Sequence, residues 1–81
     1  MMQINEAIPY TIFNNYKISD IDDASTVKYY GFTDSEQNWY VMKEDTSVSP
    51  KTYRYTKGIG AYPTNWTSRA SLTYDYYYNT F

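Results

Sequence analysis

The 81-residue sequence contains neither cysteine nor histidine. Without cysteine the chain has no disulfide, no thiolate metal ligand and no thiol nucleophile. Without histidine it lacks the commonest metal-binding side chain and the usual general base near neutral pH. The carboxylates, lysines and hydroxyl groups that remain complete no catalytic motif. The composition therefore predicts a protein that is not an enzyme and that holds no metal ion and no cofactor.

Long apolar runs and a net positive charge are missing as well. No segment is long enough to span a lipid bilayer, and residues 1–6 lack the basic region and apolar stretch of a signal peptide. The formal net charge of −2 at pH 7 provides no overall attraction to nucleic acid or to an anionic membrane. We therefore expect no contact with membranes, and the net negative charge disfavours nucleic acid as a partner. Synthesis and assembly are expected in a cytoplasm.

Tyrosine is the residue that the sequence has in excess. Aromatic residues make up 21% of the chain, and twelve residues are tyrosine. A tyrosine suits both a half-buried strand and an interface, because it joins a large apolar ring to a polar tip. A chain of this length holds a single domain, residues 1–81, with a small core. Such a domain relies on dense packing or on contacts with partners.

β-Branched and aromatic residues gather in three short segments separated by polar turns. The segments are residues 26–33, 39–44 and 52–57, and residues 34–38 and 45–51 supply the turns. Strands that follow one another through short connections pair as an antiparallel meander. The predicted fold is mainly β, a small antiparallel meander sheet or barrel-like domain with a short helical turn before the last strand.

The segments on either side of these strands are less regular. Three aspartates in residues 19–25 favour a polar loop over a cation site, because the spacing of a calcium-binding loop is not met. The other expected elements are an extended arm at residues 1–9, an irregular strand at 10–18, one or two helical turns at 63–70 with Thr64 or Asn65 near the cap, a last strand at 72–78 and an aromatic docking segment at 75–81.

Charge is distributed unevenly along the chain. Residues 1–45 carry eight acidic residues and three lysines, whereas residues 46–74 carry four basic residues and no acidic one. Two halves of opposite charge can neutralise each other within the fold, or between neighbouring subunits in a head-to-tail arrangement.

The basic half is also rich in aromatic residues. Basic side chains among aromatic rings are typical of a stacking groove, which would here bind a nucleotide-like anion or a glycan. Trp39 and Trp66, the two tryptophans, are more simply explained as core residues. In the ligand-binding alternative the site consists of Tyr53, Arg54, Tyr55, Lys57, Trp66 and Arg69.

Three segments resemble a pattern in small uncharacterised proteins of tailed bacteriophages. They are Trp39-Tyr40-Val41-Met42-Lys43, Tyr53-Arg54-Tyr55, and Asn65-Trp66-Thr67-Ser68-Arg69-Ala70-Ser71-Leu72-Thr73-Tyr74. In those proteins an aromatic strand pair precedes a tryptophan, two residues, and Arg-Ala-Ser-Leu-Thr/Ser-Tyr. The resemblance covers roughly residues 16–74 and is most specific at Trp66 and at residues 69–74. It implies a phage gene neighbourhood of virion or tail components, and it implies no activity and no catalytic residue.

The leading functional hypothesis is a non-enzymatic, virion-associated structural protein, acting as an adaptor, a decoration protein or a tail or fibre accessory. Its partners would be other virion proteins and copies of itself, and it would reside in the virion after assembly in the host bacterial cytoplasm. Contacts are expected through aromatic strand faces and through Tyr76, Tyr77, Tyr78 and Phe81. The alternative is a small ligand-binding module for a glycan or a nucleotide-like anion, which includes a phage counter-defence protein.

Overall fold

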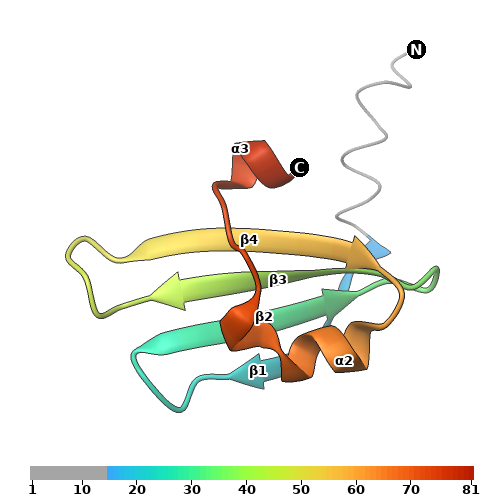
Figure 1. The fold of residues 1–81 in the computed structure, drawn as a ribbon, viewed down its shortest axis with the longest axis horizontal. Coiled ribbons are helices and arrows are strands. Elements are labelled where there is room, and N and C mark those ends of the chain that lie inside the picture. The colour runs from blue at the N-terminus through green and yellow to red at the C-terminus, as the bar shows by residue number, and fades with distance from the viewer. Residues whose placement is uncertain (1–14) are drawn as a thin grey trace.

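A computed structural model describes residues 15–81, which form one antiparallel sheet followed by short helices. The strands are β1 (Lys17–Asp22), β2 (Val27–Thr33), β3 (Asn38–Asp45) and β4 (Thr52–Ile59), and they lie side by side in chain order (Figure 1). Each strand pairs antiparallel with the next. The predicted class, mainly β with an antiparallel meander, is therefore confirmed. The extended arm expected at residues 1–9 lies outside the described residues.

The turn between β2 and β3 is held by one carboxylate. Asp34 accepts hydrogen bonds from the backbone N–H groups of Glu36 and Asn38 and from the side-chain amide of Asn38, at 2.8–2.9 Å. Gln37 completes the turn with a φ of 69°, in the left-handed region. These hydrogen bonds hold the pKa of the Asp34 carboxyl below its usual range. The turn residues thus set the register of the β2–β3 pair.

The chain that follows β4 covers one face of the sheet. It forms α2 (Tyr62–Thr67) and a 3-10 turn, η1 (Arg69–Ser71), which confirms the helical turns predicted at residues 63–70. In Figure 1, α2 lies in front of the β1 and β2 half of the sheet. Tyr62, Trp66, Leu72 and Tyr74 pack against the buried core of Tyr29, Trp39 and Val41. We call this the covered face, with residues of β2 to β4 Val27, Tyr29, Gly31, Thr33, Trp39, Val41, Lys43, Asp45, Thr52, Arg54, Thr56 and Gly58.

The position of the first strand corrects the sequence prediction. Residues 19–25 were expected to form a polar loop, but β1 runs through Asp22. The aspartates are accommodated because they have partners on the covered face: the Tyr62 hydroxyl donates to Asp20 at 2.9 Å, and Asp22 pairs with Arg69 at 3.0 Å. A bulge between Ile18 and Asp20 also breaks the alternation of side chains that marks a strand in a sequence.

The last strand predicted at residues 72–78 is replaced by an extended crossing and a helix. Only Asp75 pairs with the sheet, through an isolated antiparallel bridge to Tyr55, and α3 (Tyr77–Thr80) follows. The cap of α2 also differs, because Ala61 is the N-cap, with a φ of 55°, and Thr64 lies within the helix. Pro63, in the first turn of α2, favours a helix start at this point.

A close contact between Trp39 and Gly58 organises the core. The two residues lie opposite each other in the β3–β4 pair, and the Trp39 side chain is 4% exposed. The Trp39 indole N–H donates to the carbonyl oxygen of Gly60 at 2.8 Å, which fixes the ring in place. A Cβ atom on Gly58 would lie 2.7 Å from Cε2 of that ring. The indole therefore occupies space that any other residue at position 58 would need.

This contact predicts that Gly58→Ala destabilises the protein. In an open strand position the added methyl group would help, but here it overpacks a fixed ring, and the expected loss is about 1–3 kcal/mol in the free energy of unfolding. Urea unfolding measures the change. In a Trp39→Leu background the same substitution should cost clearly less, since the blocking ring is gone. A Gly58→Ala protein as stable as the parent would contradict the packing described.

Candidate functional site

The second face of the sheet receives no covering layer from α2 or η1. We call it the open face. Side chains alternate between the two faces of a sheet, and the bulge in β1 places Ile18 and Ile21 on the same one, opposite Phe32 and Tyr30 of β2. The strand residues of the open face are Ile18, Ile21, Lys28, Tyr30, Phe32, Asn38, Tyr40, Met42, Glu44, Tyr53, Tyr55, Lys57 and Ile59.

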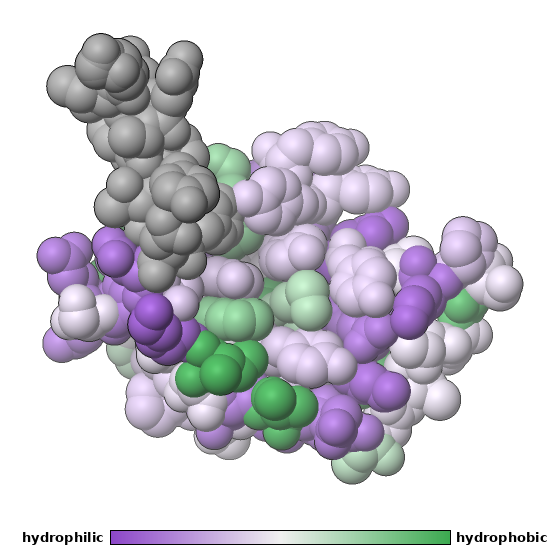
Figure 2. Space-filling view, turned by 180° about the vertical axis from the view of Figure 1, so that it is seen from behind, coloured by the Kyte–Doolittle hydropathy of each residue, from purple (hydrophilic) through white to green (hydrophobic). Residues whose placement is uncertain are grey.

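Apolar and aromatic side chains dominate the open face although much of it meets solvent. Ile18 is 51% exposed, Ile21 57%, Ile59 80% and Tyr53 40%. Figure 2 views the molecule from this side, and the strongest hydrophobic colour lies near its lower edge, where Figure 1 places β1. Antiparallel sheets that face water on one side normally carry polar residues there. This face therefore has the residue pattern of a contact surface.

One carboxylate organises the end of the open face near the β3–β4 loop. Glu44, only 9% exposed, accepts hydrogen bonds from the hydroxyls of Tyr30 at 2.9 Å and Tyr53 at 3.0 Å. Lys51 completes the group with an ion pair at 3.3 Å. The two phenol hydrogen bonds, with a smaller contribution from Lys51, hold the pKa of the Glu44 carboxyl below its usual range. The carboxylate thus fixes two tyrosines of the face in place.

The C-terminal segment wraps around the β4 edge from the covered face to the open face. Asp75 exchanges two backbone hydrogen bonds with Tyr55, at 2.8 and 2.9 Å, as the chain crosses the edge. Beyond the crossing, Phe81 contacts the ring of Tyr40, with ring centroids 5.2 Å apart, and Tyr77 contacts Tyr55 at 5.3 Å. Burial, with smaller contributions from neighbouring tyrosines, raises the pKa of Tyr40 to about 12. The segment therefore covers the β4 end of the open face.

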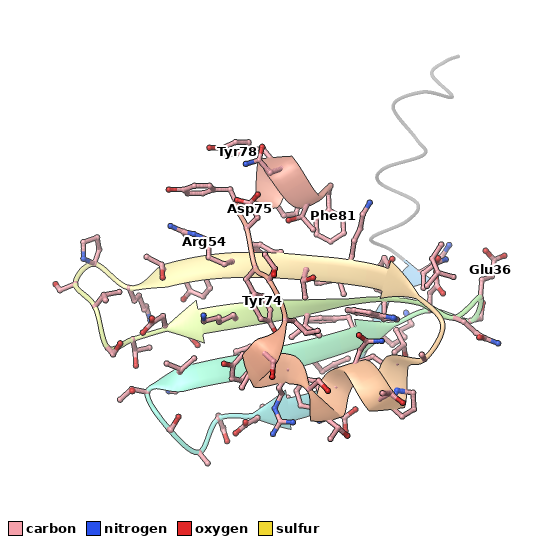
Figure 3. All side chains as sticks on the ribbon, viewed as in Figure 1. Glu36, Arg54, Tyr74, Asp75, Tyr78 and Phe81 are labelled. Atoms are coloured by element: carbon pink, nitrogen blue, oxygen red, sulfur yellow. The ribbon has the colours of Figure 1, made fainter. Side chains whose placement is uncertain are left out.

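The four residues predicted as an interface separate into two pairs. Tyr77 and Phe81 contact rings of the open face, whereas Tyr76 and Tyr78 stack on each other with centroids 5.2 Å apart, and Tyr76 also lies against Arg54 of β4. Figure 3 shows Phe81 on the sheet side of α3 and Tyr78 on the far side. Tyr78, at 74% exposed, is the most open of the four. Within the fold, residues 75–81 thus contact the open face through Tyr77 and Phe81, and contact Arg54 of β4 through Tyr76.

The six residues predicted as a ligand site do not converge. Trp66 and Arg69 lie with α2 and η1 over the covered face, where the Arg69 guanidinium stands 4.6 Å from the Trp66 ring. Arg54 lies 4.1 Å from the Tyr76 ring, and Figure 3 shows it beside the crossing segment. Lys57 lies 5.4 Å from the Phe81 ring. Tyr53 and Tyr55 belong to the open face. The basic side chains are therefore distributed over separate aromatic contacts.

Opposite charges from the two halves of the sequence meet within the chain. Among residues 15–81 the ion pairs are Asp22 with Arg69 and Glu44 with Lys51, and each joins an acidic residue of the first half to a basic residue of the second. Hydrogen bonding from Arg69 holds the pKa of the Asp22 carboxyl below its usual range. This is the first of the two charge arrangements considered from the sequence, neutralisation within the fold.

The described residues offer little that could perform chemistry. Within residues 15–81 no group of three or more potential metal ligands comes together, and no helix has the length and apolarity needed to cross a membrane. A shallow pocket of about 260 Å³ lies beside the β2–β3 turn, with Asp34, Gln37 and Tyr62 in its lining. Asp34 is committed to the turn, as described above, which leaves it poorly suited to act as a base.

Comparison of the chain with protein-family models, with curated proteins and with solved structures finds no match. Inference about function therefore depends on the chain's own geometry.

The residues of the open face outside the aromatic tail and β4 were not predicted as a site. Ile18 and Ile21 were assigned to an irregular strand and a loop, and their common face follows only from the bulge. A signal was present in residues 27–33, where Lys28, Tyr30 and Phe32 alternate with the residues of the covered face. Large side chains at both parities of a strand indicate that neither face of the sheet follows the usual pattern of a polar, solvent-facing side.

The Glu44 group predicts a pH-dependent stability. A carboxyl whose pKa is lower in the folded state stabilises the fold above its ordinary pKa, and that contribution disappears as the pH falls through the folded value. Glu44→Gln should therefore lower the free energy of unfolding more at about pH 7 than at about pH 2, where the carboxyl is protonated in the unfolded chain and the contribution of its charge to stability is reduced. Urea unfolding at the two pH values gives the difference.

Glu36→Gln is the matched control, because Glu36 is exposed in the β2–β3 turn and points away from the sheet (Figure 3). It should leave the stability nearly unchanged at both pH values. Equal effects of Glu44→Gln at the two pH values would contradict the assigned role of the carboxylate.

Two adjacent tyrosines test the orientation of the C-terminal segment. Tyr77→Ala removes ring contacts with Tyr55 and Phe81 and should lower the free energy of unfolding by about 1 kcal/mol. Tyr78→Ala removes only the outward stack on Tyr76 and should cost much less. Thermal unfolding of both variants measures the contrast. A larger loss for Tyr78→Ala would mean that α3 docks with its other side on the sheet.

Proposed function

We propose that the protein is a non-enzymatic subunit of a larger assembly and that it acts through protein–protein contacts made by the open face. The observation that carries this proposal is the exposure of Ile18, Ile21, Tyr53 and Ile59 on a face whose strand residues are mostly apolar or aromatic. Apolar side chains that remain in water cost free energy that a partner surface can recover. Tyrosine-rich patches of this kind are favoured in interfaces.

The polar groups of the open face are compatible with this role. Burying an unpaired charge in an interface is costly, but Glu44 already has hydrogen bonds from two phenols and an ion pair with Lys51. The same hydrogen bonds hold Tyr30 and Tyr53 in one orientation, so that little side-chain entropy is lost when a partner covers them. Part of the face is thus organised before any contact is made.

The absence of a converging set of reactive groups among residues 15–81 supports a non-enzymatic role. Asp22, Asp34 and Glu44 each have hydrogen-bond donors that lower the pKa, a feature of structural carboxylates and not of proton donors near neutral pH. The setting is proposed from the sequence resemblance alone. That resemblance supports a tailed-bacteriophage virion as the assembly, with an adaptor, decoration or tail accessory as the role, and with virion proteins and copies of the chain as partners.

Site-specific photo-crosslinking tests the proposal in the cells that produce the protein. A photoreactive amino acid at Ile59, on the open face, should give a defined covalent adduct whose partner is identified by mass spectrometry, either another protein or a second copy. The matched control carries the same amino acid at Thr64, which is exposed on α2 over the covered face, and should give no such adduct. Equal labelling from the two positions, or none from Ile59, would contradict the proposed contact surface.

A further inference from the structure

The two edge strands of the sheet, β1 and β4, differ in whether another segment pairs with their outer edge. β4 is occupied at its middle, because Tyr55 exchanges backbone hydrogen bonds with Asp75, and its carbonyl oxygen also accepts from the Thr80 hydroxyl at 3.2 Å. No described residue other than those of β2 pairs with the backbone of β1. An unpaired edge strand is a template for another strand. Within residues 15–81 the outer edge of β1 is therefore the place where the sheet can be extended.

The sequence of β1 is complementary to itself in the antiparallel direction. The strand reads Lys17-Ile18-Ser19-Asp20-Ile21-Asp22. If two copies pair about a two-fold axis between Ser19 and Asp20, Lys17 lies opposite Asp22 and Ile18 lies opposite Ile21. Each pair shares a face, because Ile18 and Ile21 belong to the open face, while Lys17 and Asp22 align with Thr33 and Tyr29 of the covered face. Opposite charges and apolar residues thus meet across the new edge, as cross-strand pairs require.

Other registers are worse for the same six residues. If the two Ile21 residues faced each other, Asp20 would lie opposite Asp22 and two carboxylates would be brought together. A shift by one residue would place an aspartate opposite an isoleucine on the wrong face. The bulge adds selectivity, because a regular strand falls out of register when it passes the bulge between Ile18 and Asp20. A second copy of the strand has the same bulge at the same place.

We propose that a second copy of this chain pairs with it along β1, and this inference rests on the proposed contact function of the open face. The pairing joins two sheets into one and makes the two open faces continuous. Four half-exposed isoleucines, Ile18 and Ile21 of each copy, then form one apolar cluster across the seam. The doubled face provides a partner with a larger surface than one chain offers. Because interfaces below about 1,200 Å² hold weak complexes, a six-residue strand pair should dissociate on dilution.

Light-scattering mass measured over a range of concentrations tests the pairing. The full chain should change from 9.6 kDa to twice that mass as its concentration rises, with no larger species. Ile21→Lys places a lysine in the seam and should weaken the dimer at least tenfold. Lys17→Glu, which faces Asp22 of the second copy, should weaken it as well. Thermal unfolding of each variant verifies that the monomer remains folded, which the 57% exposure of Ile21 favours.

Ile59→Lys is the matched control, because Ile59 lies on the same open face at the opposite edge and is even more exposed. It should leave the dimer intact. Hydrogen exchange adds a positional readout, since amides of residues 17–22 should gain protection as concentration rises. If Ile21→Lys and Ile59→Lys dissociate the species equally, or if larger species form that neither changes, the β1 pairing is wrong while a contact role for the open face stands. A monomer at every concentration also overturns the pairing, and the photo-crosslinking from Ile59 then decides the proposed function separately.

Discussion

A four-stranded sheet has two faces, and the segment that follows β4 packs over one of them and reaches the other only at its β4 end. Residues 62–74 supply the tyrosine, tryptophan and leucine that seal Tyr29, Trp39 and Val41 into the covered face. Residues 75–81 cross the β4 edge at Asp75 and cover only the nearby part of the open face. Among residues 15–81, two features follow from this limited coverage. The core is small, and the second face meets solvent with apolar side chains.

Two close contacts on the covered face are possible only because glycine has no side chain. Trp39 lies against Gly58, and the ring of Trp66 and the hydroxyl of Tyr62 lie where a side chain on Gly31 would be. Gly31 lets the side chains of α2 approach the sheet closely, and Gly58 makes room for the Trp39 ring of the neighbouring strand. The pair of Asp22 with Arg69 and the hydrogen bond of Tyr62 to Asp20 then join α2 and η1 to β1. The edge strand is thereby tied to the core by its covered side while its open side carries Ile18 and Ile21.

The sequence predicted the parts of the fold where local pattern and tertiary structure agree. β2, β3 and β4 were recognised because β-branched and aromatic residues are bounded there by turn residues, as at Asp34. β1 was missed because its aspartates resemble a loop, and their partners, Tyr62 and Arg69, are more than forty residues away. The prediction of a last strand at residues 72–78 was wrong, because the alternating tyrosines give no sign that the chain crosses the β4 edge there. That both faces of the sheet carry large side chains could have been predicted from the alternation in residues 27–33. How much of the open face residues 75–81 cover could not, because it depends on where that segment lies in the folded chain.

The open face as a contact surface is the central claim, and its exposure in the native setting tests it most directly. Hydroxyl-radical footprinting of the full chain should be performed in extracts of the cells that make it and on the purified protein at low concentration. The account predicts that Ile18, Ile21 and Tyr53 are protected in the extract and reactive in the dilute purified protein. Val48, which is 47% exposed in the β3–β4 loop, should react in both samples. Equal reactivity of the open-face residues in the two samples would contradict it.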